Sequence, residues 1–299
     1  MIRSQRRLLT PGEMFPSGDP AYRASFLRLR SGLRVRVVEA GDTDAAPVLF
    51  VHGWGCSVYI FRRNMPALAR AGFRSIAVDL KGHGLSDKPV TSDEYTIDSL
   101  VEHLCDILDA LQIEKPALVG HSLGGSLIYH FAARYPTRVQ CLGLLAPVGL
   151  KGVPLMRLYR AATPKLFAPI FGQIKPRRIV QLALWRVYGH RGHFTKRDVE
   201  EFLAPSQFPE FALAVRELLH SYDWNAADDR PMTILDLPAV GLWGSLDHLM
   251  PSDGMAVYLP LLPRIVLSAI PDAGHIIPEE TPEEVNAAIL GLLRAAATS

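Results

Sequence analysis

Residues 120–124 read Gly-His-Ser-Leu-Gly, a spacing that can present a nucleophilic serine. The segment follows the apolar run PALVGH and precedes a stretch with helical spacing, so Ser122 falls on a turn between a strand and a helix. Glycines two residues before and two residues after the serine remove side chains that would collide in so sharp a turn. This context favours a hydroxyl that attacks an electrophilic carbon over a serine that only caps a helix.

A serine hydroxyl needs a base within hydrogen-bond reach, and the base needs a third group to orient it. For a serine on a strand-turn-helix, the acid and then the histidine follow later in the chain. Only one of the later histidines, His275, comes after the last apolar run, in the glycine-containing loop IPDAGHIIPEE. His275 is therefore the predicted general base, ahead of four alternatives: His190, His193, His220 and His248.

The predicted acid is Asp247, which lies just beyond the apolar run PAVGLWG in the segment GSLDHLMP. Its carboxylate can emerge at the same sheet edge as Ser122. Asp236 precedes that run, Asp253 is placed to start a helix, and Asp272 is placed to support the histidine loop. The run before it ends in LLAPVGL, which holds no acid.

An attack on a carbonyl also needs donors for the developing oxyanion, and backbone amides are a natural source. Leu123 follows the predicted nucleophile at the start of a helix. Trp54 lies in the segment HGWG after another apolar run, where glycines make the turn pliant. The amides of Trp54 and Leu123 are the predicted oxyanion hole, and the indole of Trp54 can line a pocket at the same time.

A second polar loop follows the apolar run FRSIAVD and contains Asp79, Gly82, His83, Gly84 and Ser86. It lacks the glycine pattern of a dinucleotide fold or a P-loop, so it is interpreted as a structural turn beside the site.

Metal binding is not indicated by the sequence. His190 and His193 form an HxxH pair without a third ligand nearby in the chain. Three scattered cysteines, Cys56, Cys105 and Cys141, suggest neither a disulfide framework nor a zinc site. We expect no metal and no organic cofactor.

The order of the elements predicts an α/β fold. Two alternating runs, at 24–30 and 33–40, predict a hairpin near a sheet edge. Short apolar runs at 47–52, 73–79, 116–121, 139–146, 238–244 and 264–270 alternate with helical stretches, which is typical of a parallel sheet covered on both faces. Apolar residues at three- and four-residue steps predict a crossover helix from Ile97 to Leu111, and a final helix is predicted from Glu279 to Ala297.

Strand signals are missing from residues 148–232, which predicts a helical cap between two parts of a core at 1–147 and 233–299. Its aromatic residues are candidate pocket walls: Phe167, Phe171, Trp185, Phe194 and Phe202. From Lys151 to Arg197 the chain has eleven Lys or Arg residues and no acid. Such a basic cap can contact a lipid surface, but the favoured interpretation is that its arginines are solvated or paired with acids.

Composition limits the class of protein to which the chain can belong. A net charge of +2 requires no nucleic-acid partner, and 48% hydrophobic residues can build a substantial core. The N-terminal segment lacks the apolar stretch of a signal peptide, and no run reaches the length of a membrane span. With unpaired cysteines, this predicts a cytoplasmic protein.

Taken in order, HGWG, DLKGHGLSDKP, GHSLGG, GSLDHLMP and DAGH make the chain resemble the α/β-hydrolase superfamily over essentially its full length. The resemblance implies a mostly parallel central sheet of about eight strands with helices on both faces and a helical cap. Within the superfamily the chain is similar to capped serine carboxylesterases and monoacylglycerol-lipase-like enzymes. Epoxide hydrolases and haloalkane dehalogenases share similar flanking motifs but use aspartate where this chain has Ser122, which argues against both activities.

The expected reaction is hydrolysis of a small carboxylic ester with an apolar part, through an acyl-enzyme on Ser122. Carbon-carbon bond hydrolysis of a diketone-like acid is the alternative, because such hydrolases also use a serine and a basic cap could bind the carboxylate. A third hypothesis is that the protein is a non-catalytic ligand receptor on a hydrolase scaffold. The presence of Ser122, Asp247 and His275 together disfavours it.

Overall fold

The computed structural model describes residues 7–164, 177–229, 231–250 and 252–298. Eight strands form one sheet in the order β1-β2-β4-β3-β5-β6-β7-β8. Strand β2 runs antiparallel to both of its neighbours, and all other neighbouring pairs are parallel. Their bounds are β1 Arg23–Arg28, β2 Arg34–Ala40, β3 Pro47–Val51, β4 Arg74–Val78, β5 Ala117–His121, β6 Cys141–Leu145, β7 Ala239–Gly244 and β8 Ile265–Ile270.

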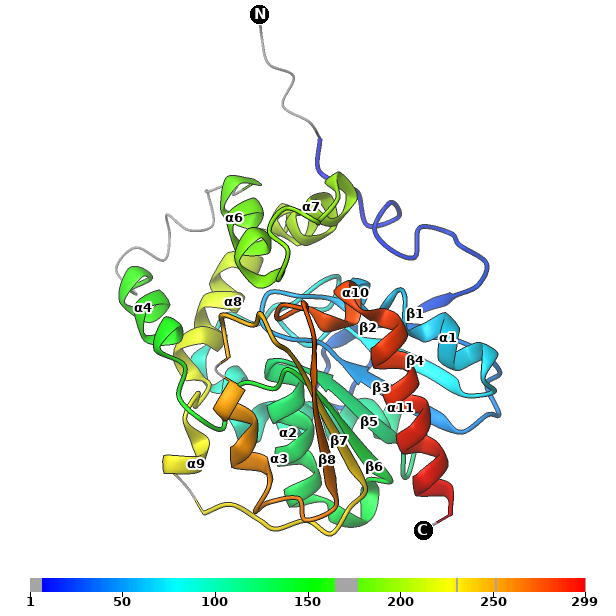
Figure 1. Cartoon of the computed structure of the whole chain (residues 1–299). Coiled ribbons are helices and arrows are strands. Elements are labelled where there is room, and N and C mark those ends of the chain that lie inside the picture. The colour runs from blue at the N-terminus through cyan, green and yellow to red at the C-terminus, as the bar shows by residue number, and fades with distance from the viewer. Residues whose placement is uncertain (1–6, 165–176, 230, 251, 299) are drawn as a thin grey trace, which may run out of the picture.

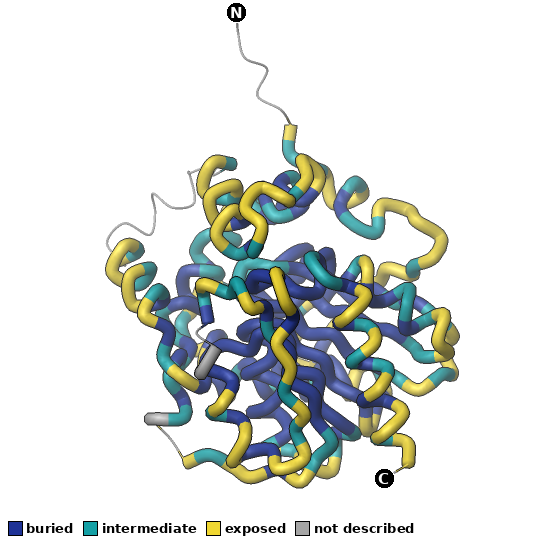
Figure 2. The backbone as a smooth tube through the Cα atoms, in the orientation of Figure 1, coloured by how far each residue is buried: buried dark blue, intermediate teal, exposed yellow. Residues whose placement is uncertain are grey.

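Helices cover both faces of this sheet (Figure 1). One face packs against α2 (Ile97–Ala110) and α3 (Leu123–Arg134), and the other against α1 (Met65–Arg70) and α11 (Pro282–Ala297). The strands alternate between the two cores: Leu49 and Val51 of β3 belong to the first, and Val48 and Phe50 to the second. Figure 2 shows the result, with buried strands at the centre and exposed residues on the outer faces of the helices. The predicted α/β fold and sheet are therefore confirmed.

The remaining helices lie mostly between β6 and β7, and most of them gather beyond one end of the sheet, whereas α9 lies apart at the lower left of the view (Figure 1). We call them the insertion helices: α4 Pro154–Ala162, α6 Arg177–Val187, α7 Lys196–Leu203, α8 Glu210–Ser221 and α9 Ala226–Asp229. The described part of this segment contains no strand. Short 3₁₀ helices occur at η1 Val58–Phe61, η2 Ser92–Tyr95, η3 Pro136–Arg138, η5 Ala204–Gln207 and η6 Ser252–Tyr258.

One predicted element needs correction. The final helix does not begin at Glu279, because that residue belongs to a separate short helix, α10 (Ile277–Glu280). Thr281 then leaves the helical region with φ −135° and ψ 58°, and α11 starts at Pro282. A proline disfavours the helical conformation of the residue before it and supplies no amide hydrogen, so it separates the two helices.

No helix in the described part of the chain is both long and apolar enough to cross a membrane.

Candidate active site

Ser122 occupies a strained turn between β5 and α3. Its φ of 54° and ψ of −121° lie outside the regions that side-chain-bearing residues usually adopt. The neighbouring glycines make this turn possible: a Cβ on Gly120 would lie 2.3 Å from the Gly124 carbonyl oxygen, and one on Gly124 would lie 2.1 Å from the Val51 carbonyl oxygen. The turn places the serine at the carboxyl end of β5, as the Gly-x-Ser-x-Gly spacing predicts.

The structure brings the three predicted side chains together. The Nε2 atom of His275 lies 2.9 Å from the Ser122 hydroxyl oxygen, and Nδ1 lies 2.7 Å from Asp247 Oδ2. All three side chains are largely shielded from water. An imidazole with its proton on Nδ1 donates to Asp247 and leaves Nε2 free to accept the serine proton, which is the arrangement that general-base activation requires.

Asp247 is held in the ionised form that this arrangement uses. Burial alone would raise its pKa, but the adjacent His275 and the hydrogen bonds to the carboxylate hold the pKa below its usual range. Two of these bonds come from the backbone amides of Leu249 and Met250, at 2.8 Å and 3.0 Å. The loop after β7 therefore fixes both the charge and the direction of the carboxylate.

The two predicted oxyanion donors belong to segments that flank the serine. Leu123 is the first residue of α3, where helix amides have no partner within the helix. Trp54 follows β3, and its neighbour Gly53 packs directly against the serine turn, since a Cβ there would lie 2.8 Å from Ser122 Cβ. The indole Nε1–H of Trp54 donates to the Val215 carbonyl of α8 at 2.8 Å, so the side chain anchors this loop to the insertion helices.

Buried neutral histidines support the loops around the site. His52 Nε2 accepts the Leu80 amide at 3.0 Å, and His83 Nε2 accepts the Gly55 amide at 3.1 Å. Burial lowers the pKa of both imidazoles, that of His83 to about 3, so they remain neutral acceptors at neutral pH. These two histidines connect the loop after β3 to the loop after β4.

The loop after β4 is organised by a buried ion pair. Arg36 Nε donates to Asp79 Oδ2 at 2.7 Å. The same carboxylate accepts the amides of Val58 and Leu85 at 2.9 Å and 2.7 Å. Gly84 is required beside it, because a Cβ at that position would lie 1.9 Å from the carboxylate. This geometry gives the loop the structural role that the sequence suggests.

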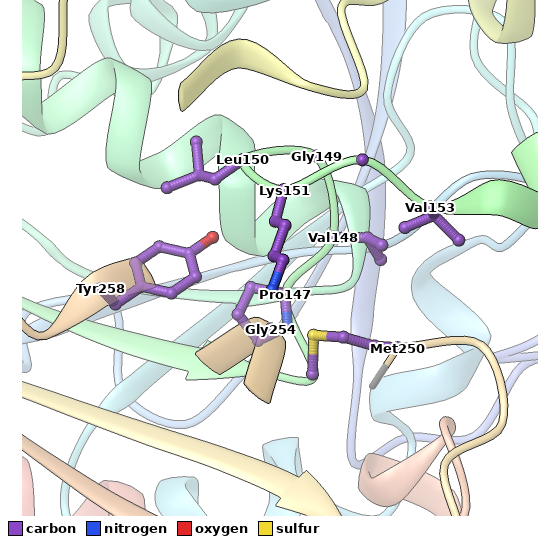
Figure 3. Close-up of a pocket in the computed structure, with 10 residues that line it drawn as sticks. Pro147, Val148, Gly149, Leu150, Lys151, Val153, Met250, Gly254 and Tyr258 are labelled. Carbon is purple, nitrogen blue, oxygen red and sulfur yellow. The ribbon is translucent and has the colours of Figure 1, made fainter. Parts of the chain in front are cut away.

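A small pocket lies between the loop after β6 and the segment that contains Met250 and Tyr258 (Figure 3). Pro147 and Val148 form one side, and the Val148 amide donates to the Ser122 carbonyl at 3.1 Å. Met250, from the loop that carries Asp247, and Tyr258 form the other side. The lining combines apolar side chains with that of Lys151, and the volume of about 30 Å³ is close to that of one water molecule.

The aromatic residues of the insertion that were predicted as candidate pocket walls lie in different environments. Phe202 packs against the core residue Tyr59 and so contributes to the contact between insertion and core, whereas Phe194 packs against Tyr188 of the insertion itself. Trp185 is 39% exposed and lies under the guanidinium of Arg191. Phe167 and Phe171 lie outside the described residues.

His190 and His193 stack on each other in an exposed turn. The described residues contain no cluster of three or more His, Cys, Asp or Glu side chains that could hold a metal ion.

Two side chains that hold the loop of His275 were not predicted from the sequence. His121 Nε2 donates to the His275 carbonyl at 2.9 Å, and Glu280 accepts the amides on either side of His275. The only sequence signal for Glu280 is a charged pair directly after the short apolar stretch that follows the histidine. Spacing alone does not reveal that its carboxylate folds back.

The family follows from this fold and from direct comparison. A family model described as the alpha/beta hydrolase fold matches residues 46–282, so the chain belongs to the α/β-hydrolase family. Membership and the relatives below support a hydrolytic enzyme.

Three curated relatives show the range of similar proteins. A Pseudomonas putida protein, the dihydrolipoyllysine-residue acetyltransferase component of an acetoin cleaving system, is 31% identical over 88% of this chain and 67% of its own length. Bifunctional epoxide hydrolase 2 from Sus scrofa is 36% identical, over 46% of this chain and 25% of its length. A Burkholderia vietnamiensis hydrolase of 2-hydroxy-6-oxononadienedioate and 2-hydroxy-6-oxononatrienedioate is 29% identical over 88% and 91%. The chain thus spans about two thirds, a quarter and nine tenths of these proteins.

Solved structures agree on the fold. A Burkholderia cenocepacia protein provisionally described as an aryl esterase aligns with a TM-score of 0.77 and 24% identity, over 93% of this chain and all of that one. The epoxide hydrolase CorEH aligns with a TM-score of 0.78 and 22% identity, over 92% and 99%. At these identities the likeness concerns the fold alone.

Proposed function

We propose that this protein is a serine hydrolase with Ser122 as nucleophile, His275 as general base and Asp247 as the orienting acid. The observation that carries the proposal is the unbroken chain of contacts from the Ser122 hydroxyl through the imidazole to the Asp247 carboxylate, at 2.9 Å and 2.7 Å. Proton transfer needs heavy atoms within about 3.2 Å, and both contacts meet this requirement.

In the proposed reaction, the Ser122 oxygen attacks an acyl carbonyl while His275 Nε2 takes its proton. The amides of Trp54 and Leu123 stabilise the oxyanion, and each such donor contributes about 3 kcal/mol to transition-state stabilisation. The imidazolium then protonates the leaving group, which leaves an acyl group on Ser122. Water, activated by the same imidazole, releases the acid and restores the hydroxyl. These steps need no metal or organic cofactor.

Carboxylic esters are the proposed substrates, as for the carboxylesterase and monoacylglycerol-lipase-like group. An apolar acyl or alcohol group is proposed because residues 148–232 are rich in aromatic side chains that can form pocket walls. In this proposal residues 148–232 act as a cap over the site, and the ester is a small molecule. Epoxide hydrolysis is not proposed, because epoxide hydrolases use an aspartate nucleophile at the position where this chain has Ser122.

Carbon-carbon bond hydrolysis is the second candidate. The relative from Burkholderia vietnamiensis, whose name describes hydrolysis of oxo-dienedioates, covers nearly the full length of both chains at 29% identity. A diketone-like acid carries carboxylates, and the basic stretch between Lys151 and Arg197 could pair with them. Both reactions can use the same serine.

One panel of substrates distinguishes the two candidates. Wild type and Ser122→Ala are compared on p-nitrophenyl esters of increasing chain length and on a vinylogous diketone acid. Ester turnover that is lost in the variant supports the esterase. A higher kcat/KM for the diketone acid supports the second candidate. If neither substrate class is turned over, a non-catalytic ligand receptor on a hydrolase scaffold becomes the better hypothesis.

A further inference from the structure

The last residue of helix α6, Val187, and the two residues after it contact the loop of the proposed base; we call these three residues the end of α6. The Val187 carbonyl accepts the backbone amide of His275 itself, at 2.7 Å. The next residue, Tyr188, donates its hydroxyl to Glu279 Oε2 at 2.5 Å, and Gly189 donates its amide to Glu280 Oε2 at 2.8 Å. The insertion therefore binds the loop of the base directly, and not only the rim of the site.

Glu280 connects both sides of this contact. Besides the Gly189 amide, its carboxylate accepts the Gly274 amide at 3.1 Å and the Ile276 amide at 3.3 Å. These two amides immediately precede and follow His275. A single carboxylate thus joins the end of α6 to both backbone neighbours of the base, and an ionised acceptor makes such bonds stronger than a neutral one.

Steric fit makes the contact sensitive to small movements. A Cβ on Gly274 would lie 2.2 Å from the Gly189 nitrogen, and a Cβ on Gly189 would lie 2.6 Å from the Gly274 nitrogen. The two backbones pack against each other without intervening side chains. A displacement of one segment must therefore move the other.

The same contact is anchored to the core by buried charges. Arg62 lies 2.9 Å from Glu279 and 2.8 Å from Asp198 of α7, and both acids are almost fully buried. Tyr59 donates to the same Asp198 oxygen at 2.6 Å. Breaking such a buried pair is costly, so the seated position of α6 and α7 is well defined.

We propose that the docked end of α6 and Glu280 position His275, so that the imidazole is an effective base only while α6 is seated on its loop. This inference rests on the proposed function, and it makes Gly189 and Glu280 positioning residues without contact to the reacting atoms. The insertion then controls the rate of chemistry through the base, independently of any contact with substrate.

Two variants test this coupling from its two sides. Gly189→Ala places a methyl group between α6 and the loop of the base. Glu280→Gln keeps the shape of the side chain but replaces one acceptor oxygen with a donor that faces backbone N–H groups. We expect kcat for the preferred ester to fall about 10- to 100-fold in each, since misplacing a catalytic group by about 1 Å costs about 100-fold. KM should change by less than about threefold, because the binding surface is intact.

Matched controls use the same chemical changes elsewhere. Gly291→Ala lies on α11, where a Cβ would meet nothing within 4 Å, and Glu283→Gln is exposed on the same helix. Both controls should keep kcat within about twofold of wild type.

A second readout is independent of turnover. The proton between His275 Nδ1 and Asp247 should give a far-downfield ¹H NMR resonance, and Asp247→Asn identifies this resonance by removing it. Gly189→Ala and Glu280→Gln should shift or broaden this resonance, and the two controls should not. If wild type hydrolyses neither substrate class but the resonance responds as expected, the proposed function fails while the positioning stands.

The proposal is overturned if the folded Glu280→Gln variant keeps both wild-type kcat and an unchanged resonance. Should Gly189→Ala fail to fold, the nearly isosteric Glu280→Gln still decides the question. A rise in KM alone, with kcat unchanged, would also overturn it, because that result places the effect in substrate binding.

Discussion

Gly53 and Ser122 come from the ends of different strands, yet a Cβ on Gly53 would lie only 2.8 Å from the Cβ of Ser122. The same Cβ would lie 3.2 Å from His121 Nδ1. The loop that carries the Trp54 amide is therefore held directly against the nucleophile turn. Only glycine permits this approach.

Gly53→Ala should lower kcat by about 100-fold with a small change in KM, because the methyl group must push the loop of Trp54, a proposed oxyanion donor, away from the serine turn. The measurement is steady-state kinetics on the preferred ester, with Gly291→Ala as the matched control. Wild-type kcat in a folded Gly53→Ala protein would refute the assigned position of the oxyanion donors.

Asp247→Asn should reduce kcat by a factor on the order of 10⁴ while the fold persists, because an amide no longer selects the imidazole tautomer that accepts the serine proton. Steady-state kinetics of the purified variant measure the loss of kcat, and thermal unfolding checks that the fold persists. A loss of less than about tenfold would show that another acid orients His275.

Asp79→Asn should lower the free energy of unfolding by about 3 to 5 kcal/mol, because Arg36 would be left buried without its counter-charge. Urea unfolding measures the change, and Asp93→Asn, at an exposed position in the following segment, is the control. Equal unfolding midpoints for Asp79→Asn and wild type would contradict the structural role of this loop.

Acid should destabilise the protein through its buried histidines. Burial lowers the pKa of His83 and His121 from 6.5 to about 3. Below pH 6.5 the unfolded chain binds protons that the folded chain excludes, so stability present above pH 6.5 is lost as the pH falls towards 3. Each histidine contributes a slope of up to about 1.4 kcal/mol per pH unit.

His83→Gln isolates one of these contributions, since the amide oxygen can still accept the Gly55 amide. Urea unfolding between pH 7 and pH 4 should give a shallower dependence for the variant than for wild type. Parallel curves would contradict the assigned pKa.

The sequence predicts the sheet because six of its strands are short apolar runs between glycines, prolines and charges, and because Ile97 to Leu111 has a clear helical period. It also places Ser122, Asp247 and His275 at one edge, since residues that follow parallel strands meet there. What it predicts poorly is contact between distant segments. The break at Thr281-Pro282 was missed because the apolar spacing continues across it.

The contacts around His275 could not be predicted from the sequence, and the reason is physical. The hydrogen bond between Val187 and His275 joins two backbone groups 88 positions apart. Every residue except proline carries the same backbone groups, so the residue types do not reveal such a bond. Glu280 likewise acts through three amides, so nothing in its neighbours' identities reveals its role. Only the glycines at 189 and 274 hint at close packing, and glycines of this kind also occur in ordinary turns.

The central claim is that the Ser122 hydroxyl is activated by His275, and covalent labelling tests it most directly. A p-nitrophenyl alkylphosphonate is incubated with the protein, and intact-mass and peptide mass spectrometry locate the adduct. We predict one phosphonyl group on Ser122, no adduct in Ser122→Ala, and labelling of His275→Gln slowed by a factor on the order of 10⁴. An adduct on another residue, or equal labelling of His275→Gln and wild type, would contradict the mechanism.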